Sequence, residues 1–484
     1  MTMDATEGLQ PEAVWRFFRE ISAIPRESKH EERIREYVLG EAARTGLRGV
    51  ADGAGNVVVY KPGSAPGPAV ILQAHLDMVC EKDKGTEHDF HTDPIRLVRD
   101  GDWIRGDGTT LGGDNGIGVA AMLALMEDRT LSHPDLELLF TIDEETGLTG
   151  AYGLDPSLLT GRTLVNLDSE EDGTLFIGCA GGRSTDISLE VKLEPAPPRF
   201  TPVLVKVAGL KGGHSGTDIH RGRGNAIKLL VRFFKELDPR RYHLASFSGG
   251  SKHNVIPREA QAVILVNQGG ALAGLNELAL FMTRAFATEL SGIDEGVRVK
   301  VLKDAGQPAQ VISPADTARI LDLLHALPHG AMQVNPEGGG SALSSTNLAI
   351  CGLAGSKFGV LTNQRSASKT SIDDISEMTA SIGRLSGAAV VKGDDYPAWK
   401  PDAGSRVLAV AKRAHERLFG KPPGVKVIHA GLECAVFGEK IPGLDMISLG
   451  PTIEQAHSPS ERMRTADVEK LWLLLAAILG ELSS

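Results

Sequence analysis

The chain has 484 residues, of which 42% are hydrophobic and 23% charged, a composition typical of soluble globular proteins. One hydrophobic core rarely serves a chain of this length, so we expect two or more domains. The net charge of −11 argues against nucleic acid or an anionic membrane as the main partner. No apolar stretch is long enough to cross a bilayer, and the first residues do not resemble a signal peptide. The four cysteines are widely spaced without a CxxC pair, which favours a reducing cytoplasm.

Helix and strand patterns alternate in the first part of the chain. Apolar residues at helical spacing predict helices over 14–24, 31–45 and 118–128. Apolar runs predict strands over 69–79, 136–147 and 162–171. Alternation of this kind predicts an α/β domain with a mainly parallel sheet, in which ligands bind beyond the carboxyl ends of the strands.

The pattern changes near residue 190, where the proline-rich run LEPAPPRFTP indicates a domain crossing. The segment that follows is rich in strands and helices and predicts an α+β domain, possibly built from two similar halves. Its predicted strands cover 201–210, 241–250, 254–266, 297–305, 345–350 and 357–366, and its predicted helices cover 225–237, 275–290, 315–327 and 371–388.

The last part of the chain returns to the first pattern, with helices predicted over 406–418 and 468–482 and strands over 425–431 and 446–451. The predicted fold is therefore α/β: a discontinuous catalytic domain with a mixed, mainly parallel sheet flanked by helices, plus an inserted α+β lid domain. The predicted boundaries are 1–188 and 396–484 for the catalytic domain and 189–395 for the lid.

Side chains of the kind that bind metals stand near the ends of the predicted strands. Each has an ordinary alternative: Asp114, for example, could cap the helix that follows it, and a buried histidine usually makes hydrogen bonds within the core. Their joint occurrence at strand ends argues for a site, and imidazole with carboxylate suits zinc, with manganese or cobalt as substitutes. These side chains are His75, Asp77, Asp114, Glu144, Glu145, Asp168 and His457.

Two histidines and three carboxylates are more than one open catalytic zinc needs. They fit two ions that share a bridging carboxylate, roughly 3.5–4 Å apart, with a water between them. Because neighbours on a strand face opposite sides, Glu145 is expected to bind metal and Glu144 to accept the proton of the water. Asp77, on the same strand face as His75, is expected to accept the imidazole N–H.

Several motifs, in order along nearly the whole chain, resemble those of the aminoacyl-histidine dipeptidases (Xaa-His dipeptidases, carnosinase-like), members of the co-catalytic di-zinc peptidase family. They are HLDMVCEKD, GTTLGGDNGIG, TIDEETGLTGA, NLDSEE, GLKGGHSGTDIH and KHNVIPREA. The resemblance implies that His75 and Asp168 bind one zinc, that Glu145 and His457 bind the other, and that Asp114 bridges them.

The resemblance also implies a substrate-binding lid that mediates dimerisation. His214 of GGHSGTD and Asn254 of KHNVIP are expected to contact the substrate, and Arg365 of LTNQRSAS to grip its terminal carboxylate. Glu433 of HAGLECAVF could face the free amine of the substrate or form a structural ion pair.

The expected function is hydrolysis of unblocked dipeptides, with Xaa-His substrates such as β-alanyl-histidine the preferred class. One alternative is an N-acyl-amino-acid deacylase or desuccinylase with the same two-metal centre, and another is a non-enzymatic binding protein on this fold. The expected setting is a cytoplasmic homodimer with a small dipeptide substrate and neither nucleic acid nor membrane as partner. A serine hydrolase is excluded because GGHSGTD does not have the G-x-S-x-G spacing.

Overall fold

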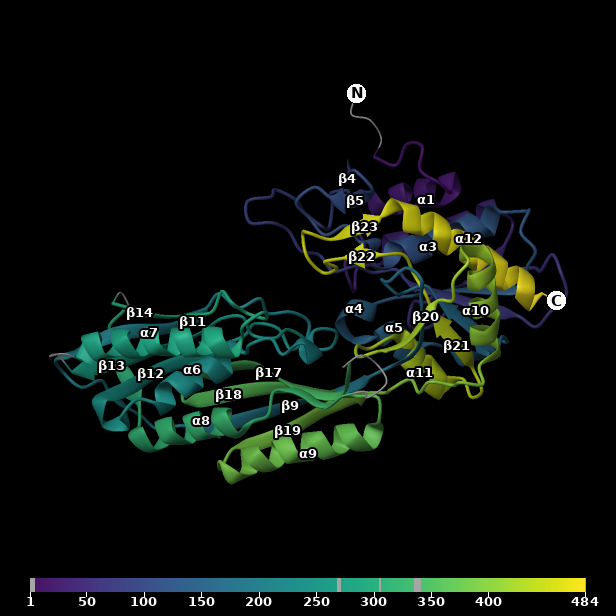
Figure 1. Cartoon of the computed structure of the whole chain (residues 1–484). Helices are drawn as coiled ribbons and strands as arrows, with labels where there is room; N and C mark the ends of the chain where they lie inside the picture. Colours follow the sequence, from purple (N-terminus) through teal and green to yellow (C-terminus); the bar gives the residue numbers. More distant parts are fainter. Residues whose placement is uncertain (1–4, 268–270, 304–305, 335–340, 484) are drawn as a thin grey trace. The chain divides into compact units, whose positions relative to one another are not determined.

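The computed structural model of the protein describes residues 5–267, 271–303, 306–334 and 341–483 (Figure 1). The chain divides into two compact units. Unit 1 consists of Met1–Cys179, Trp399–Val427 and Leu432–Ser484, and unit 2 of Ala180–Ala398 and Ile428–Gly431. None of the described helices is both long and apolar enough to cross a membrane.

The central sheet of unit 1 is mixed. Its four middle strands are parallel to one another, whereas the strands at its β1 edge pair antiparallel. Both β3 and β6 are buried along their whole length, as expected for parallel strands covered on both faces. The strand order is β1 (Arg48–Ala51), β2 (Val57–Lys61), β6 (Leu136–Thr141), β3 (Val70–His75), β7 (Thr163–Asn166), β21 (Asp445–Ser448), β8 (Thr174–Cys179) and β20 (Gly424–Ile428).

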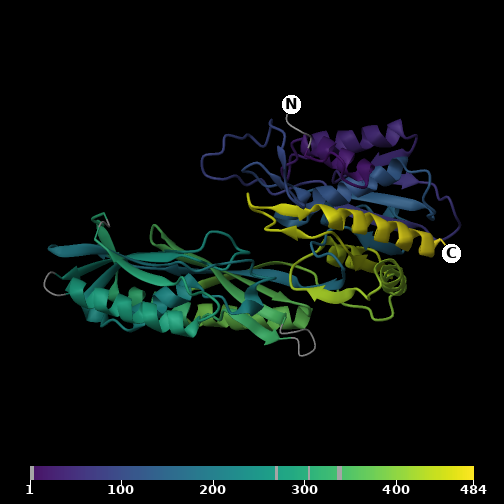
Figure 2. The ribbon, with the colours of Figure 1, turned by 45° about the horizontal axis from the view of Figure 1, so that its top comes forward.

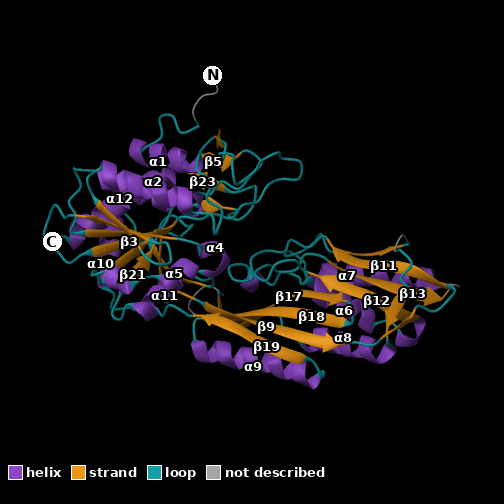
Figure 3. Cartoon of the chain, turned by 180° about the vertical axis from the view of Figure 1, so that it is seen from behind, coloured by secondary structure: helices purple, strands orange, loops and turns teal. Residues whose placement is uncertain are grey.

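Helices enclose this sheet (Figure 3). The apolar core joins strand residues such as Leu72 and Phe140 to helix residues such as Phe18, Met122 and Leu475. A smaller sheet has the order β22 (Ile453–Glu454), β23 (Arg462–Arg464), β5 (Trp103–Gly106) and β4 (Leu97–Asp100). The helices are α1 (Glu12–Ser22), α2 (Glu32–Arg44), α3 (Gly113–Glu127), α4 (Glu144–Gly147), α5 (Thr149–Gly153), η1 (Pro156–Leu158), α10 (Arg406–Phe419), α11 (Glu433–Lys440) and α12 (Thr465–Leu482).

Unit 2 is built on an antiparallel sheet with helices packed against it (Figure 2). Burial alternates along Val203–Val207, which is typical of a sheet with one covered and one exposed face. The order is β14 (Arg298–Leu302), β11 (Phe200–Ala208), β13 (Ala260–Asn267), β12 (Tyr242–Gly249), β17 (Ala342–Ala354), β18 (Lys357–Ser366), β9 (Gly181–Glu190) and β19 (Ala389–Tyr396), with β16 (Gly330–Val334) beside β17. The remaining elements are β10 (Leu193–Pro195), β15 (Gln310–Ile312), α6 (Ala226–Lys235), α7 (Ala271–Glu289), α8 (Pro314–Ala326), α9 (Lys369–Leu385), η2 (Ile219–Arg221) and η3 (Pro239–Arg241).

The structure confirms an α/β part interrupted by an α+β part, with different limits from those predicted. The chain enters unit 2 after Cys179 rather than after residue 188, because strand β9 pairs with β18 of that unit. It leaves unit 2 after Ala398 rather than after residue 395, and the short segment Ile428–Gly431 also belongs to unit 2. The proline-rich run therefore lies inside unit 2, where it covers β10, the loop 196–199 and the first residues of β11.

The strand predicted over 297–305 is observed as β14, and its last two residues lie outside the described residues. The two similar halves stay a prediction. Strands from both parts of the inserted segment join one continuous sheet, through the pairing of β12 with β17.

Candidate metal centre

Five of the predicted ligands come together in unit 1, arranged around Asp114. One oxygen of Asp114, Oδ1, lies 3.1 Å from Nε2 of His75, and the other, Oδ2, lies 3.1 Å from Nε2 of His457. Asp168 Oδ1 is 3.3 Å from the same nitrogen of His75, and Glu145 Oε2 is 3.1 Å from the same nitrogen of His457. The side chains thus form two groups, each with one histidine and one carboxylate of its own, that share Asp114.

The fold brings these residues to one edge of the central sheet. His75 is the last residue of β3, and Asp168 follows the end of β7, the neighbouring parallel strand. Asp114 lies at the start of α3, Glu145 in the short helix α4, and His457 between β22 and β23. Carboxyl ends of parallel strands meet at one edge, where α/β proteins commonly bind their ligands.

The donor set fits metal cations because it has too little positive charge of its own. Oε1 of Glu145 is buried and accepts no hydrogen bond from any described residue. Burial, assisted by the charge of Asp114, raises the pKa of Glu145 to about 7. Burial likewise raises the pKa of Asp168 to about 6, against the opposing effect of His75. Buried carboxylates of this kind are stable as anions when cations or strong donors compensate them, and divalent ions would supply that charge.

Asp77 links the metal centre to the turn that carries the two glutamates. Its Oδ1 lies 3.3 Å from Nδ1 of His75, so it can hold the ring N–H and leave Nε2 to face a metal. The same carboxylate accepts the backbone N–H groups of Glu144 at 3.0 Å and Glu145 at 3.1 Å, and the hydroxyl of Ser28 at 2.8 Å. Burial opposes ionisation of Asp77, but the hydrogen bond and charge of His75 prevail and lower its pKa.

Glu144 and Glu145 do not lie on a strand, and this expectation was wrong. Strand β6 ends at Thr141, and both glutamates belong to α4. Asp143 has a left-handed backbone (φ 49°) and donates its N–H to Glu31, so the chain turns as it leaves the strand.

The two glutamates nevertheless have different surroundings. No hydrogen bond or ion pair joins the carboxylate of Glu144 to any residue that the structure describes, whereas that of Glu145 meets His457. Burial and then the neighbouring Glu145 charge raise the pKa of Glu144 well above its usual range. The carboxylate of Glu144 thus lies beside the proposed metal ligands but is not bonded to any of them.

Two buried charged residues that the sequence did not single out form hydrogen bonds with the backbone next to the predicted ligands. The Glu461 carboxylate accepts the N–H groups of Leu111 at 2.8 Å, Gly112 at 3.0 Å and Gly113 at 2.8 Å. The guanidinium of Arg26 donates to the carbonyls of Leu76, Asp77 and Gly112. The sequence signal that could have indicated Glu461 was the glycine-rich turn before Asp114, because the backbone N–H groups at the start of a helix require an acceptor.

Glu433 is fully buried in unit 1, where the charges of His75, Asp168 and Asp77 act on it. Its Oε2 accepts hydrogen bonds from Gln73 Nε2 at 2.5 Å and Thr141 Oγ1 at 2.7 Å. Burial is the main cause that raises its pKa to about 8. No ion pair joins Glu433 to a described residue, so the predicted structural ion pair is absent there. Its contact with a substrate amine stays a prediction.

The three predicted substrate residues of the inserted segment belong to unit 2. The backbone of His214 bridges to Val255, and the carbonyl of Asn254 accepts the N–H of Ser215 at 2.8 Å. Nδ1 of His214 accepts the N–H groups of Gly216 and Thr217. These bonds fix the GGHSGTD turn beside the KHNVIP segment.

Arg365 lies on β18 and is 5% exposed, with Nη1 donating to the hydroxyl of Tyr396 at 2.7 Å. His429, which the sequence reading missed, is buried in the same unit with its Nε2 2.7 Å from Ser345 Oγ. Burial, followed by the charges of Arg365 and His220, lowers the pKa of His429 to about 3. The histidine was missed because its segment, VKVIHAG, reads as an ordinary strand end.

This edge of the central sheet carries two groups of histidine and carboxylate that share Asp114. Glu144 lies beside them, and its carboxylate is not bonded to either group. Histidine and carboxylate donors gathered in this way are typical of metal-dependent hydrolases. Comparison with known proteins agrees with that class. Residues 71–481 match the profile of Peptidase family M20/M25/M40, and the chain belongs to this family.

Two relatives match almost the entire chain. The cytosol non-specific dipeptidase of Escherichia coli (strain K12) is 38% identical over 488 aligned residues, covering 99% of each chain. The crystal structure of aminoacylhistidine dipeptidase from Vibrio alginolyticus has a TM-score of 0.79 at 38% identity, covering 99% of this chain and 98% of that one. Human carnosine dipeptidase 1 shares the fold at 13% identity, with a TM-score of 0.52 over 97% of this chain and 96% of that one.

Proposed function

We propose that the protein is a metal-dependent dipeptidase that hydrolyses unblocked dipeptides, with Xaa-His substrates such as β-alanyl-histidine among them. The observation that carries the proposal is the shared position of Asp114, with one oxygen toward His75 and the other toward His457. The names of the two full-length relatives support dipeptides as the substrate class. The two names differ in substrate range, one being non-specific and the other naming aminoacyl-histidine. The range of dipeptides that this protein cleaves is therefore the property to measure.

The proposed centre holds two divalent ions. His75 and Asp168 would bind one, Glu145 and His457 the other, and Asp114 both. Zinc suits this set of imidazole and carboxylate donors, with manganese or cobalt as substitutes. When bound, such ions polarise the scissile carbonyl and make water more acidic.

Glu144 is proposed as the general base and then the general acid. Its carboxylate would take a proton from the attacking water and deliver it to the leaving amine. The raised pKa that burial and Glu145 give Glu144 falls when cations approach, which returns the carboxylate to its ionised form. Asp77 would keep the His75 ring in the tautomer that presents Nε2, while its bonds to the α4 backbone hold Glu144 and Glu145 in place.

On the substrate side, we propose that Arg365 binds the terminal carboxylate and that His214 and Asn254 contact the substrate carbonyl or carboxylate. A guanidinium suits this role because its paired N–H groups match the two carboxylate oxygens. We further propose a cytoplasmic homodimer formed through unit 2, consistent with the cytosol in the name of the E. coli relative. Light scattering coupled to gel filtration would report the oligomeric state.

The decisive experiment measures amino-acid release from β-alanyl-histidine, a panel of Xaa-His dipeptides and matched Xaa-Xaa dipeptides without histidine. Each is assayed before chelation, after chelation and after zinc or manganese is returned. Cleavage that chelation abolishes and metal restores supports the proposal, and the ratio between the panels gives the specificity. Cleavage of N-acetyl or N-succinyl amino acids without cleavage of any dipeptide would replace the proposal with a deacylase.

A further inference from the structure

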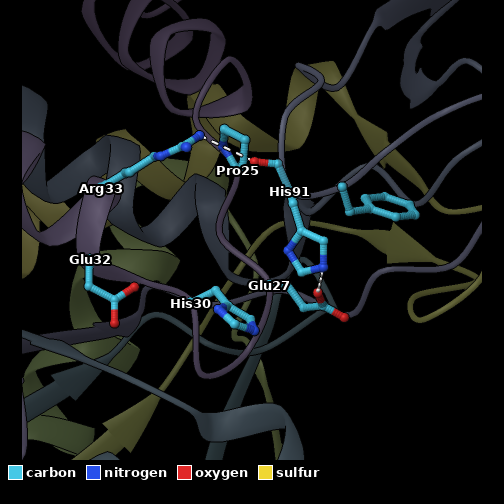
Figure 4. Close-up of a pocket in the computed structure, with 7 residues that line it drawn as sticks. Pro25, Glu27, His30, Glu32, Arg33 and His91 are labelled. Carbon is cyan, nitrogen blue, oxygen red and sulfur yellow. Dashed lines mark hydrogen bonds and ion pairs between the residues drawn. The ribbon is translucent and has the colours of Figure 1, made fainter.

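A second cluster of potential metal ligands lies in unit 1 and shares no residue with the metal centre. Glu27, His30 and His91 each place one ligand atom so that all three atoms lie within 4.8 Å of one another. The three side chains line a cavity of about 240 Å³, together with Pro25, Glu32, Arg33 and Phe90 (Figure 4). Imidazole and carboxylate are again the donor types.

The cluster joins two parts of the chain that are distant in sequence. Glu27 and His30 lie in the connection between α1 and α2, and His91 lies in the long connection between β3 and β4. Two hydrogen bonds tie the connection between β3 and β4 to the helices on either side of the first connection: Arg33 Nη1 of α2 donates to the carbonyl of His91 at 3.2 Å, and the N–H of Ile95 donates to the carbonyl of Ser22 of α1 at 2.8 Å. The fold therefore brings the three ligands together through backbone placement, before any ion binds.

The distances between the three side chains are close to those of a metal site. His91 Nε2 lies 3.6 Å from Glu27 Oε2, and the rings of His30 and His91 meet edge to face with centroids 5.1 Å apart. Zinc bonds of about 2.0–2.2 Å place neighbouring ligand atoms roughly 3.3–3.6 Å apart in a tetrahedral site. The pair of Glu27 and His91 already meets that spacing. The ligand atom of His30 lies within 4.8 Å of the other two, and its side chain is exposed.

We propose that Glu27, His30 and His91 form an additional divalent-cation site, selective for zinc or a similar borderline ion. Two imidazoles and one carboxylate favour zinc over magnesium and calcium, which prefer oxygen ligands alone. The cavity leaves room for water as the remaining ligand. With His91 58% and Glu27 39% exposed, an ion bound here would be accessible to solvent. Its effect is to pin the connection between β3 and β4 to the start of α2.

The test uses the full-length protein with its metal centre loaded. Zinc-loaded wild type is first freed of excess metal by gel filtration. It is then dialysed to equilibrium against a series of free zinc concentrations, and the zinc bound per chain is measured by mass spectrometry. We expect one further equivalent per chain in wild type. Removal of one of three ligands, in His30→Ala, His91→Ala or Glu27→Gln, is expected to weaken that equivalent by at least about tenfold.

Glu32→Gln is the matched control, because Glu32 lines the same cavity and carries the same charge without belonging to the cluster. It should bind the further equivalent as wild type does. Equal weakening by Glu27→Gln and Glu32→Gln would mean general attraction by negative charge and would overturn the site. So would absence of the further equivalent, or its persistence in both histidine variants. The metal retained after gel filtration should be equal in all variants, which keeps this result separate from the state of the metal centre.

Discussion

Asp114 shows how much of the proposed chemistry depends on one side chain. Its two oxygens face different histidines, each at 3.1 Å, so a single carboxylate defines the relation between the two groups of ligands. Asp77 has a comparable double role one step further out, toward the His75 ring and toward the backbone of α4. A change at either residue would disturb several others, whereas a change at Glu144 would disturb only its own carboxylate.

Glu144→Gln should therefore separate proton transfer from metal binding. We expect kcat for dipeptides to fall by roughly 10²–10⁴-fold, the usual contribution of a general acid–base group, with metal content unchanged. Glu145→Gln is the paired control and should lose metal, because Glu145 faces His457. The measurements are steady-state kinetics and metal analysis of the same preparations. Near-normal turnover in Glu144→Gln would remove the residue from the mechanism.

Arg365→Ala should act on substrate binding. Loss of a paired contact with the substrate carboxylate should raise KM by about tenfold or more, with a smaller change in kcat. Arg365→Lys should recover only part of the loss, because an ammonium keeps the charge but lacks the planar pair of donors. A KM for dipeptides that is the same in wild type and Arg365→Ala would show that the carboxylate binds elsewhere.

His429 makes the stability of unit 2 depend on pH. Its pKa is about 3 in the folded protein, through burial and then the charges of Arg365 and His220, against about 6.5 in an unfolded chain. The unfolded chain therefore binds the proton first, and stability is lost as the pH falls from about 6.5 toward 3. By pH 5 this amounts to about 2 kcal/mol.

The comparison for this effect is His429→Gln, which keeps a hydrogen-bonding partner for Ser345 but does not titrate. Urea unfolding followed by far-ultraviolet circular dichroism at pH 7.5 and pH 5 measures the difference. Wild type should lose about 2 kcal/mol more than the variant over this interval. Equal losses in the two proteins would mean that His429 is accessible to protons in the folded state.

At the scale of the elements, the presence and starts of the strands could be predicted well, and their ends and the turns beyond them poorly: strands predicted to reach residues 79, 147 and 171 end at His75, Thr141 and Asn166. Burial of apolar side chains defines β3 and β7, so the positions of His75 and Asp168 followed from the sequence pattern. The α4 turn did not, because it depends on Asp77 and Glu31 accepting its backbone N–H groups from other parts of the chain. Long-range acceptors of this kind leave no local pattern.

The same reason explains the misplaced boundary before residue 189. A proline-rich run is a local signal for a loop, and the structure does have one there, between β10 and β11. The boundary itself depends on the pairing of β9 with β18, whose partners are far apart in sequence. Likewise, the role of His429 depends on Ser345 and Arg365, neither of which is near it in the chain.

Glu461→Gln tests whether a long-range acceptor positions Asp114, the proposed bridging ligand. An amide of similar size keeps one oxygen but presents an NH₂ group to backbone donors, so at least one of the N–H groups of Leu111, Gly112 and Gly113 loses its acceptor. We expect weaker metal binding, by about 10–100-fold, with turnover per loaded centre much less affected. Metal affinity by competition with a chelating dye, and kcat at saturating metal, give the two numbers. A fall in kcat at saturation with unchanged affinity would contradict the positioning role.

At the scale of the whole molecule, the proposed ligands of the metal centre all belong to unit 1, although they come from both ends of the chain. The centre therefore joins the segments before and after the insertion. Binding of metal to the folded form alone should stabilise unit 1 by about 2.7 kcal/mol per site when free metal is 100 times the dissociation constant. The fold of unit 2 should gain nothing directly from this binding.

The tryptophans allow this difference to be measured in the intact protein. All four, Trp15, Trp103, Trp399 and Trp472, fall within the ranges of unit 1, and unit 2 has none. Tryptophan fluorescence thus reports the unfolding of unit 1, whereas far-ultraviolet circular dichroism reports both units. On chelation we expect the fluorescence transition to move to lower temperature. The circular dichroism curve should then show two steps, with unit 1 unfolding at the lower temperature and unit 2 at the higher. When zinc is restored, only the lower-temperature step should move back to its original temperature. Asp114→Asn, which weakens the shared ligand, should make the fluorescence transition nearly insensitive to chelation. A parallel shift of both signals would mean that the two units unfold as one and that metal stabilises the whole chain.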